Sequence, residues 1–255
     1  HSLRRRQRQM CIRDRHYNDS QVVIMLSENP TLIDMHVHSS CSDGLHHPIQ
    51  LVKYAKRKGL SGIAIVDHVP KNWSGHVIIK RFRLYEEASL KADFLVLPGI
   101  ELCLSEGHVL AIFPSFDLDL TFSSDVGDLP SLSEYVRSVG GIVIAAHVYR
   151  RSGLGLSAFK YANYLDALEY YPPPALDYLK DLNLPRTAGS DSHTALTLGF
   201  AATAFGEDVS SPMEALELIR RGLVKPICRR SFYLRKLLDF TRLLDLRLVL
   251  RLLTS

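Results

Sequence analysis

Residues 34–44 read DMHVHSSCSDG, and a second short stretch far downstream, residues 189–193, reads GSDSH. Each stretch holds metal-type ligands two residues apart, and residues two apart on a strand point to the same face. Imidazoles and carboxylates that converge in a cleft are good ligands for zinc, manganese or iron. One such pair is common by chance, but two indicate a metal site. The expected neighbours are His36 with His38 and Asp191 with His193.

Composition is that of a globular protein with a real core. The chain has 255 residues, of which 46% are hydrophobic and 23% charged, enough for one large α/β domain or two small ones. Its net charge of +4 is unevenly placed, because residues 1–17 and residues 229–255 each carry +5 and the part between them carries −6. An acidic centre suits cation binding, although an ordinary acidic domain would show the same balance.

Several classes of protein are disfavoured by what the sequence lacks. The four cysteines, Cys11, Cys41, Cys103 and Cys228, are far apart, which argues against a zinc knuckle or a disulfide framework and favours a reducing cytoplasm. No apolar run reaches the roughly 18 residues of a membrane-spanning helix. The first residues also lack the apolar core of a signal peptide.

We expect three parts along the chain. Residues 1–19 are a basic tail without apolar periodicity, disordered or non-native, with a nucleic-acid arm as the alternative. Residues 20–228 form the folded domain. Residues 229–255 form a basic, Leu-rich amphipathic helix, which we expect to pack on the domain or on a second subunit of a homo-oligomer. Attachment to a membrane surface is the weaker alternative for this helix.

Strands and helices alternate through the domain. We predict strands at residues 31–38, 60–66, 94–97, 107–113, 142–146, 165–170, 186–190, 199–205 and 223–227. We predict helices at residues 48–58, 77–91, 131–139, 174–182 and 212–221. The third helix should start at a Ser131 cap, with Glu134 completing a capping box. Repeated strand–helix units with apolar strands indicate a parallel sheet or barrel, in which chemistry sits at the carboxyl ends of the strands.

Nine ligand-type residues fall at or near these strand ends. They are His36, His38, Asp43, His68, Glu101, His108, His147, Asp191 and His193. Taken alone, His68 or His108 would more often be an ordinary histidine. As a set, the nine exceed the four or so ligands that one catalytic ion needs. They suffice for two or three ions, with Glu101 as a natural bridging carboxylate.

The same motifs, in this order, resemble those of the PHP (polymerase and histidinol phosphatase) domain family. The matching stretches are HVHSSCSDG, IAIVDH, PGIELCLSEGHVLAIF, GGIVIAAH and GSDSH, and the resemblance runs from about Thr31 to about Cys228. It implies a distorted (β/α)7 barrel of parallel strands, with a metal site at their C-terminal ends.

The resemblance also implies which residues share an ion. One ion would be held by His36, His38, Glu101 and Asp191, a second by Glu101, His108 and His147, and a third by Asp43, His68 and His193. The two or three divalent ions would be zinc, manganese or iron. Asp34 and Asp67 fit better as carboxylates that orient neighbouring histidines.

The implied activity is hydrolysis of a phosphoric ester by a metal-bound hydroxide. The substrate would be a small phosphomonoester, a nucleotide or a short oligonucleotide, and the catalytic residues Glu101, Asp191 and His193. Arg150 and Arg151 are candidates for gripping phosphate. No pattern for sequence-specific DNA binding appears. Two alternatives stay open: an amidohydrolase-type barrel that cleaves a C–N bond, and a metal-stabilised regulatory module without turnover.

Overall fold

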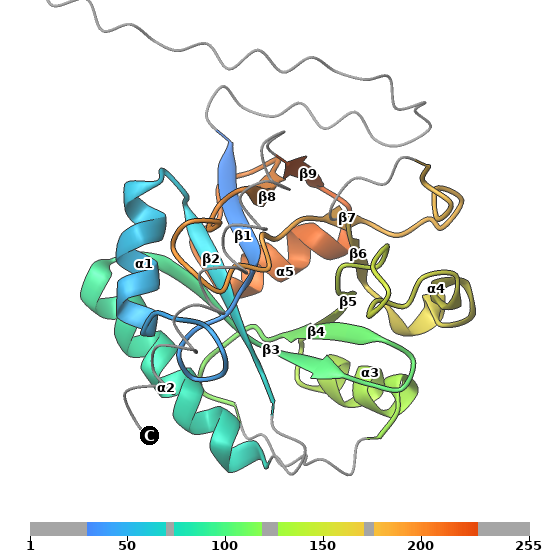
Figure 1. Ribbon diagram of the computed structural model, residues 1–255, viewed down its shortest axis with the longest axis horizontal. Helices are drawn as coiled ribbons and strands as arrows, with labels where there is room; N and C mark the ends of the chain where they lie inside the picture. Colours follow the sequence, from blue (N-terminus) through green and yellow to red (C-terminus); the bar gives the residue numbers. More distant parts are fainter. Residues whose placement is uncertain (1–29, 70–73, 119–126, 171–175, 229–255) are drawn as a thin grey trace, which may run out of the picture.

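One sheet of nine strands dominates the computed structural model, which describes residues 30–69, 74–118, 127–170 and 176–228 (Figure 1). The strand order is β7-β6-β5-β4-β3-β2-β1-β8-β9. The strands are β1 (Thr31–Val37), β2 (Gly62–His68), β3 (Leu95–Cys103), β4 (His108–Ile112), β5 (Ile142–Ala145), β6 (Ala167–Glu169), β7 (Arg186–Thr187), β8 (Ala201–Phe205) and β9 (Val224–Cys228).

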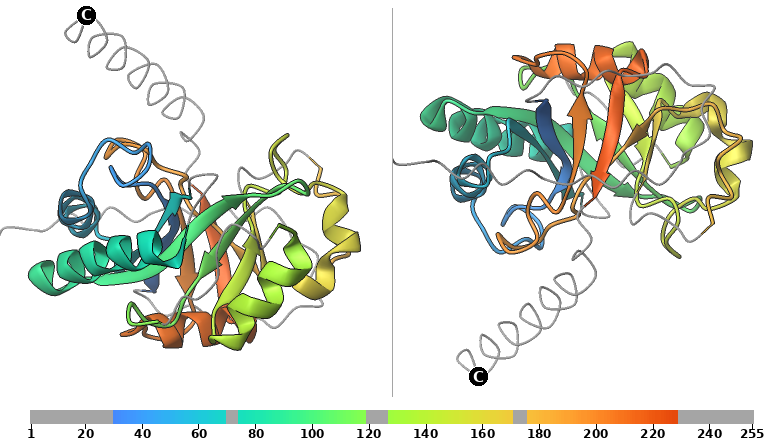
Figure 2. Two further views of the ribbon diagram at one scale, coloured as in Figure 1. Left: turned by 90° about the horizontal axis from the view of Figure 1, so that it is seen from below. Right: turned by 90° about the horizontal axis from the view of Figure 1, so that it is seen from above.

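The sheet curls into a nearly closed barrel. Its two terminal strands, β7 and β9, contact each other, and the curvature is visible in both views of Figure 2. The expected distorted barrel is therefore confirmed. Its strands are mixed in direction, however, since only β1–β2–β3 and β5–β6–β7 run parallel within the described part. The short Leu104–Gly107 turn between β3 and β4 makes that pair a hairpin, because a parallel crossover needs a much longer connection.

Helices pack against this sheet on the outside of the barrel and at one of its ends. They are α1 (Pro48–Arg57), α2 (Gly75–Ala92), α3 (Leu129–Ser138), α4 (Ser157–Lys160) and α5 (Pro212–Arg220), with a short 3₁₀ helix at Ala162–Tyr164. Helices α1 and α2 pack together on one flank, and α3 and α4 lie on the other (Figure 1). No helix in the described part of the chain is long and apolar enough to cross a bilayer.

Two of the helix predictions are wrong in detail. Helix α3 begins two residues early, at Leu129, and its cap is Asp128, whose side chain accepts a hydrogen bond from the Ser131 amide at 2.8 Å. Proline in the first turn spares one amide that would otherwise need a partner. The helix predicted at 174–182 is absent from its described part, residues 176–182, which forms turns. The predicted tail at 1–19 and helix at 229–255 lie outside the described residues.

Alternation along the strands separates two apolar cores. Inside the barrel, Met35, Val66 and Leu110 pack with α5 residues such as Leu216. Outside it, the other strand face packs under α1, α2 and α3, where Phe82 is fully buried. Helix α5 therefore fills the end of the barrel that lies toward the start of β1. Polar ligands are confined to the other end.

An irregularity in β1 turns its two histidines toward the barrel interior. Asp34 is level with Ile63 of β2, yet Val37 is level with Ile65, so β1 holds one extra residue there. Such a bulge reverses the alternation of side chains along a strand. Without the bulge, Met35 would point into the barrel while His36 and His38 pointed out of it. With it, their Nε2 atoms lie 3.1 Å apart on the inner face.

Candidate metal centre

The structure brings all nine predicted ligand residues into one cluster at the carboxyl end of the parallel strands. The ends of β1, β2 and β5 deliver the histidines of three motifs, and the hairpin of β3 and β4 delivers Glu101 and His108. Asp191 and His193 arrive on a segment that runs beside β1. There the Ser192 carbonyl accepts a hydrogen bond from the His38 amide at 2.9 Å.

The cluster divides into three groups, and the facing ligand atoms of each group lie within 4.8 Å of one another. The first group is His36, His38 and Asp191; the second is Glu101, His108 and His147; the third is His38, Asp43, His68 and His193. These groups correspond to the three ligand sets that the family resemblance implies. Two residues differ: His38 lies in both the first group and the third, and Glu101 is a member of the second group alone.

Glu101 occupies the centre of the cluster and is 1% exposed. Its Oε2 lies 3.2 Å from Nε2 of both His36 and His38, toward the first group. Its Oε1 lies 2.9 Å from Nδ1 of His108 and 3.2 Å from Nε2 of His147, in the second group. One carboxylate thus faces two groups with separate oxygens, which is the arrangement of a bridging ligand.

The third group lies nearest to solvent. Oδ2 of Asp43 is 3.2 Å from Nε2 of His193 and 3.9 Å from Nε2 of His68. The side chains of Asp43 and His68 are 36% and 32% exposed, whereas His38 is fully buried. A ligand entering from solvent would therefore meet this group first.

Opposite charges balance one another across the cluster. Burial alone would lower the pKa of His36, but the Glu169 and Glu101 carboxylates outweigh it and raise this pKa well above its ordinary value. Burial likewise opposes protonation of His38, and hydrogen bonds to Asp191 and Glu101 raise its pKa to about 9. Burial would raise the pKa of Glu101, yet the surrounding histidines lower it well below its usual range. The Glu101 carboxylate is thus anionic and is stabilised by positive charge beside it.

These donors fit divalent cations. Nδ1 of His38 is buried and has no hydrogen-bond partner among the described residues, although it lies 3.8 Å from Oδ1 of Asp43. A buried polar atom without a partner is costly unless something else binds it. Histidine nitrogens and carboxylate oxygens are also the donors that zinc, manganese and iron prefer. The cluster is therefore consistent with a site for more than one metal ion.

Asp34 and Asp67 lie behind the ligands and belong to none of the three groups. Asp34 accepts hydrogen bonds from the Ser190 amide at 2.7 Å, the Ser190 hydroxyl at 2.6 Å and the Gly199 amide at 2.8 Å. Its burial raises its pKa to about 6, against the opposing effect of these bonds. Asp34 thereby ties the segment that carries Asp191 to β1.

Glu169, the last residue of β6, is a functional residue that sequence reasoning missed. Its carboxylate accepts a hydrogen bond from Nδ1 of His36 at 3.0 Å and another from the His147 amide at 2.7 Å. A signal was present, because Glu169 follows the interior residue Ala167 by two positions and must share its face. Its lack of a recognisable motif concealed it.

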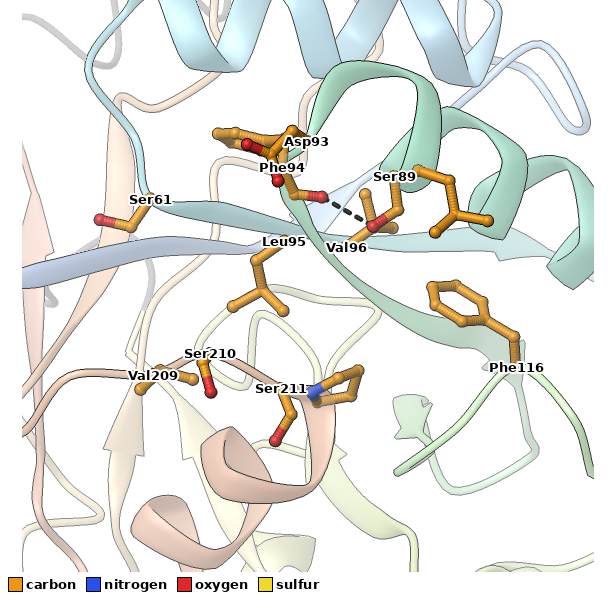
Figure 3. A pocket seen from close by; sticks show the side chains of 12 residues that line it. Ser61, Ser89, Asp93, Phe94, Leu95, Val96, Phe116, Val209, Ser210 and Ser211 are labelled. Carbon is orange, nitrogen blue, oxygen red and sulfur yellow. Dashed lines mark hydrogen bonds between the residues drawn. The ribbon is translucent and has the colours of Figure 1, made fainter.

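The two candidate phosphate-binding arginines differ in position. Nη1 of Arg150 donates a hydrogen bond to Oδ2 of Asp191 at 2.7 Å, which places the guanidinium beside the first group. Arg151 is exposed. A cavity of about 460 Å³ lies elsewhere, at the starts of β2 and β3, with Ser61, Leu95 and Ser211 in its lining (Figure 3). That cavity contains no member of the three groups.

Fold and site together define a barrel with a multinuclear ligand cluster at one end. The PHP domain family matches residues 34–178, more than half of the chain, and a PHP-associated family matches residues 173–224. The chain belongs to the PHP domain family. Its three ligand groups make it a PHP-domain protein with a candidate metal centre.

Known proteins resemble the chain at low identity. An uncharacterized protein of Methanocaldococcus jannaschii is 28% identical over 127 residues, covering 46% of this chain and 67% of that protein. A Bacteroides vulgatus structure, a two-domain protein containing a predicted PHP-like metal-dependent phosphoesterase, has a TM-score of 0.59 and 20% identity, covering 87% of this chain and 74% of its own. PsfC of Pseudomonas syringae has a TM-score of 0.61 and 17% identity, covering 86% and 99%. The two structures support the fold.

Proposed function

We propose that this protein hydrolyses a phosphoric ester, either a small phosphomonoester, a nucleotide or a short oligonucleotide. The observation that supports the proposal most is the placement of Glu101, whose two oxygens face two ligand groups. A carboxylate shared in this way would hold two ions close together, as in the two-metal sites that stabilise in-line displacement at phosphorus. Membership of the PHP domain family supports the same reading.

The residues that would hold the ions are those of the three groups, with Glu101 shared between the first and the second. Divalent ions bound there would supply an activated water at neutral pH and would neutralise phosphate charge. We assign Glu101, Asp191 and His193 the task of fixing the reacting groups in place. Glu101 and Asp191 are buried, and Nδ1 of His193 bonds to the carbonyl oxygen of Asp191, restraints that favour catalysis by positioning.

Arg150 is the proposed phosphate-binding side chain. Its guanidinium bonds one oxygen of Asp191 at 2.7 Å and is 32% exposed, so it lies between the first group and solvent. An arginine offers a planar pair of donors that matches two phosphate oxygens. Arg151 has no comparable contact with the cluster among the described residues and serves as its natural comparison.

The decisive experiment is a substrate panel on the full chain reconstituted with Mn²⁺ or Zn²⁺. Aryl phosphates, nucleotides, short oligonucleotides and cyclic amides would be compared for the unmodified chain and for Asp191→Asn and His36→Ala. Glu207→Gln is the control, because Glu207 is exposed and pairs only loosely with Arg221, at 3.6 Å. We expect phosphoester hydrolysis in the unmodified chain and the control, and its loss in the other two.

Three outcomes would contradict the proposal. Full activity and metal content in both site variants would show that the cluster is not the active centre. Turnover of cyclic amides without phosphoester hydrolysis would favour an amidohydrolase-type reaction. Absence of bound metal, together with no stabilisation by Mn²⁺ or Zn²⁺, would favour a module without turnover.

A further inference from the structure

The last two residues of β2 face opposite sides of the barrel wall. His68 points inward to the third ligand group, and Asp67 points outward beneath α2, where it is fully buried. Alternation along a strand requires this opposition. The two positions are therefore mechanically linked, since whatever holds Asp67 also fixes the backbone that carries His68.

Asp67 is bonded to the turn that carries another member of the third group. Its carboxylate accepts the Ser39 amide at 2.7 Å, the Ser39 hydroxyl at 2.5 Å and the Ser42 hydroxyl at 2.6 Å. Asp43 follows Ser42 directly. One buried carboxylate thus fixes the backbone on which both Asp43 and His68 are mounted.

Helix α2 holds this arrangement from outside through two side chains one turn apart. The hydroxyl of Tyr85 donates to Oδ2 of Asp67, and Nη1 of Arg81 donates to the carbonyl oxygen of His68 at 2.6 Å. Tyr85 is fully buried, and burial together with Asp67 raises its pKa well above its ordinary value, so it stays a donor. Residues four apart on a helix share a face, which lets α2 contact both ends of the linkage.

We propose that Tyr85 and Arg81 are positioning residues for the third ion, which they serve by holding Asp43 and His68 at ligand spacing. This inference rests on the proposed function, because that function supplies the ion. The third group has less support from surrounding packing than the first. Its members Asp43 and His68 are partly exposed, whereas His36 and Glu101 lie in the closely packed interior.

The test is a Mn²⁺ titration of the metal-free full chain, followed by calorimetry and by the electron paramagnetic resonance signal of free Mn²⁺. The variants are Tyr85→Phe and Arg81→Met. Tyr149→Phe is a matched control, because the Tyr149 hydroxyl donates a similarly short bond, 2.5 Å, to Asp177, a residue of none of the three groups. Replacing a residue that hydrogen-bonds to a metal ligand typically lowers metal affinity about 10- to 100-fold.

We expect three ions in the unmodified chain and in Tyr149→Phe. In Tyr85→Phe and Arg81→Met, two ions should bind as before, and the third should bind about 10- to 100-fold more weakly, returning at high Mn²⁺. A general loss of structure would instead weaken all three ions together, and that result would overturn the proposal. So would an unchanged third ion in Tyr85→Phe, or a chain that binds only two. A chain that binds no Mn²⁺ would overturn the proposed function and this proposal with it.

Discussion

The carboxylate of Glu169 lies 3.0 Å from Nδ1 of His36, and both side chains are fully buried. A carboxylate in this position keeps the proton on Nδ1, so that Nε2 presents its lone pair to a metal ion. Nε2 of His36 lies 3.2 Å from Glu101 and 3.7 Å from Asp191, within the cluster. Glu169 therefore determines which ring nitrogen of His36 is available to bind a metal ion.

Replacing Glu169 with Gln should weaken the first ion without unfolding the barrel. The amide can still occupy the space, but it no longer stabilises the Nδ1–H form of His36 electrostatically. We expect metal affinity at this group to fall about 10- to 100-fold. Metal content after dialysis against a weak chelator measures the effect, with Glu207→Gln as the exposed control. Equal metal content in the two variants would contradict this role.

The positions of most ligands could be predicted because they follow simple alternation. His68 and Glu101 share the faces of the interior residues Val66 and Leu97 on their strands, and such spacing is readable in a sequence. The closure of the sheet into a barrel could also be predicted, since repeated strand–helix units favour it. Glu169 follows the same alternation along its strand, but it belongs to no recognisable sequence motif.

Other features depend on contacts that a sequence does not display. The bulge in β1 that turns His36 inward depends on the register with β2. The predicted cap of α3 is Ser131, but the observed cap is Asp128. Both residue types are good N-caps, and the sequence alone does not show which of them precedes the first helical turn. Tyr85 belongs to no sequence motif, and its bond to Asp67 joins residues from different elements.

Replacing Arg150 with Met should lower kcat/KM for a phosphoester substrate by about 10- to 100-fold. A hydrogen bond to a charged group is worth about 1.5–3 kcal/mol, and each 1.4 kcal/mol is about a factor of ten. Methionine keeps the apolar stem but cannot contact Asp191 or a phosphate oxygen. Steady-state kinetics on the metal-loaded chain measures the loss.

Arg151→Met is the matched comparison for Arg150, since Arg151 is adjacent and exposed. It should change kcat/KM less than about twofold, because exposed charges contribute little. Equal losses in both variants would indicate a general effect of positive charge at this edge. No loss in Arg150→Met would show that the contact with Asp191 does not extend to substrate.

Metal affinity should rise with pH between about 6 and 9. In the metal-free protein, bonds to Cys103 and Glu101 raise the pKa of His108 to about 10, and the pKa of His38 is raised to about 9. Both rings are therefore protonated at neutral pH, and an ion must displace those protons to bind. Calorimetry in buffers of different ionisation enthalpy should detect proton release. Affinity that is independent of pH would contradict this.

The same two histidines should make the metal-free protein less stable at alkaline pH. Their pKa values are higher in the folded chain than the ordinary 6.5 of the unfolded chain. Their contribution to stability is complete below pH 6.5 and is lost as the pH rises through 9 and 10. We expect the melting temperature of the metal-free chain to fall over this range. With metal bound the rings carry no excess proton, so the decline should be much smaller.

Gly189 is a position where even one methyl group should dismantle the first ligand group. A Cβ at this residue would lie 2.3 Å from Cβ of His36 and 2.7 Å from Oε1 of Glu169, far inside van der Waals contact. Overpacking a core typically costs about 1–3 kcal/mol, and here the displaced atoms are a ligand and its support. Gly189→Ala should therefore lower both the free energy of unfolding and the content of the first ion.

Gly59→Ala separates these two effects. Gly59 ends α1 at φ 77° with nothing within 4 Å of an added Cβ, so the substitution strains the backbone without touching the cluster. It should cost about 1–2 kcal/mol of stability and leave metal content unchanged. Denaturant unfolding and metal analysis on both variants give the comparison. Gly189→Ala could instead lose stability and keep its full metal content. The segment before Asp191 would then have room to shift, and the close approach of Gly189 to His36 would not be needed for metal binding.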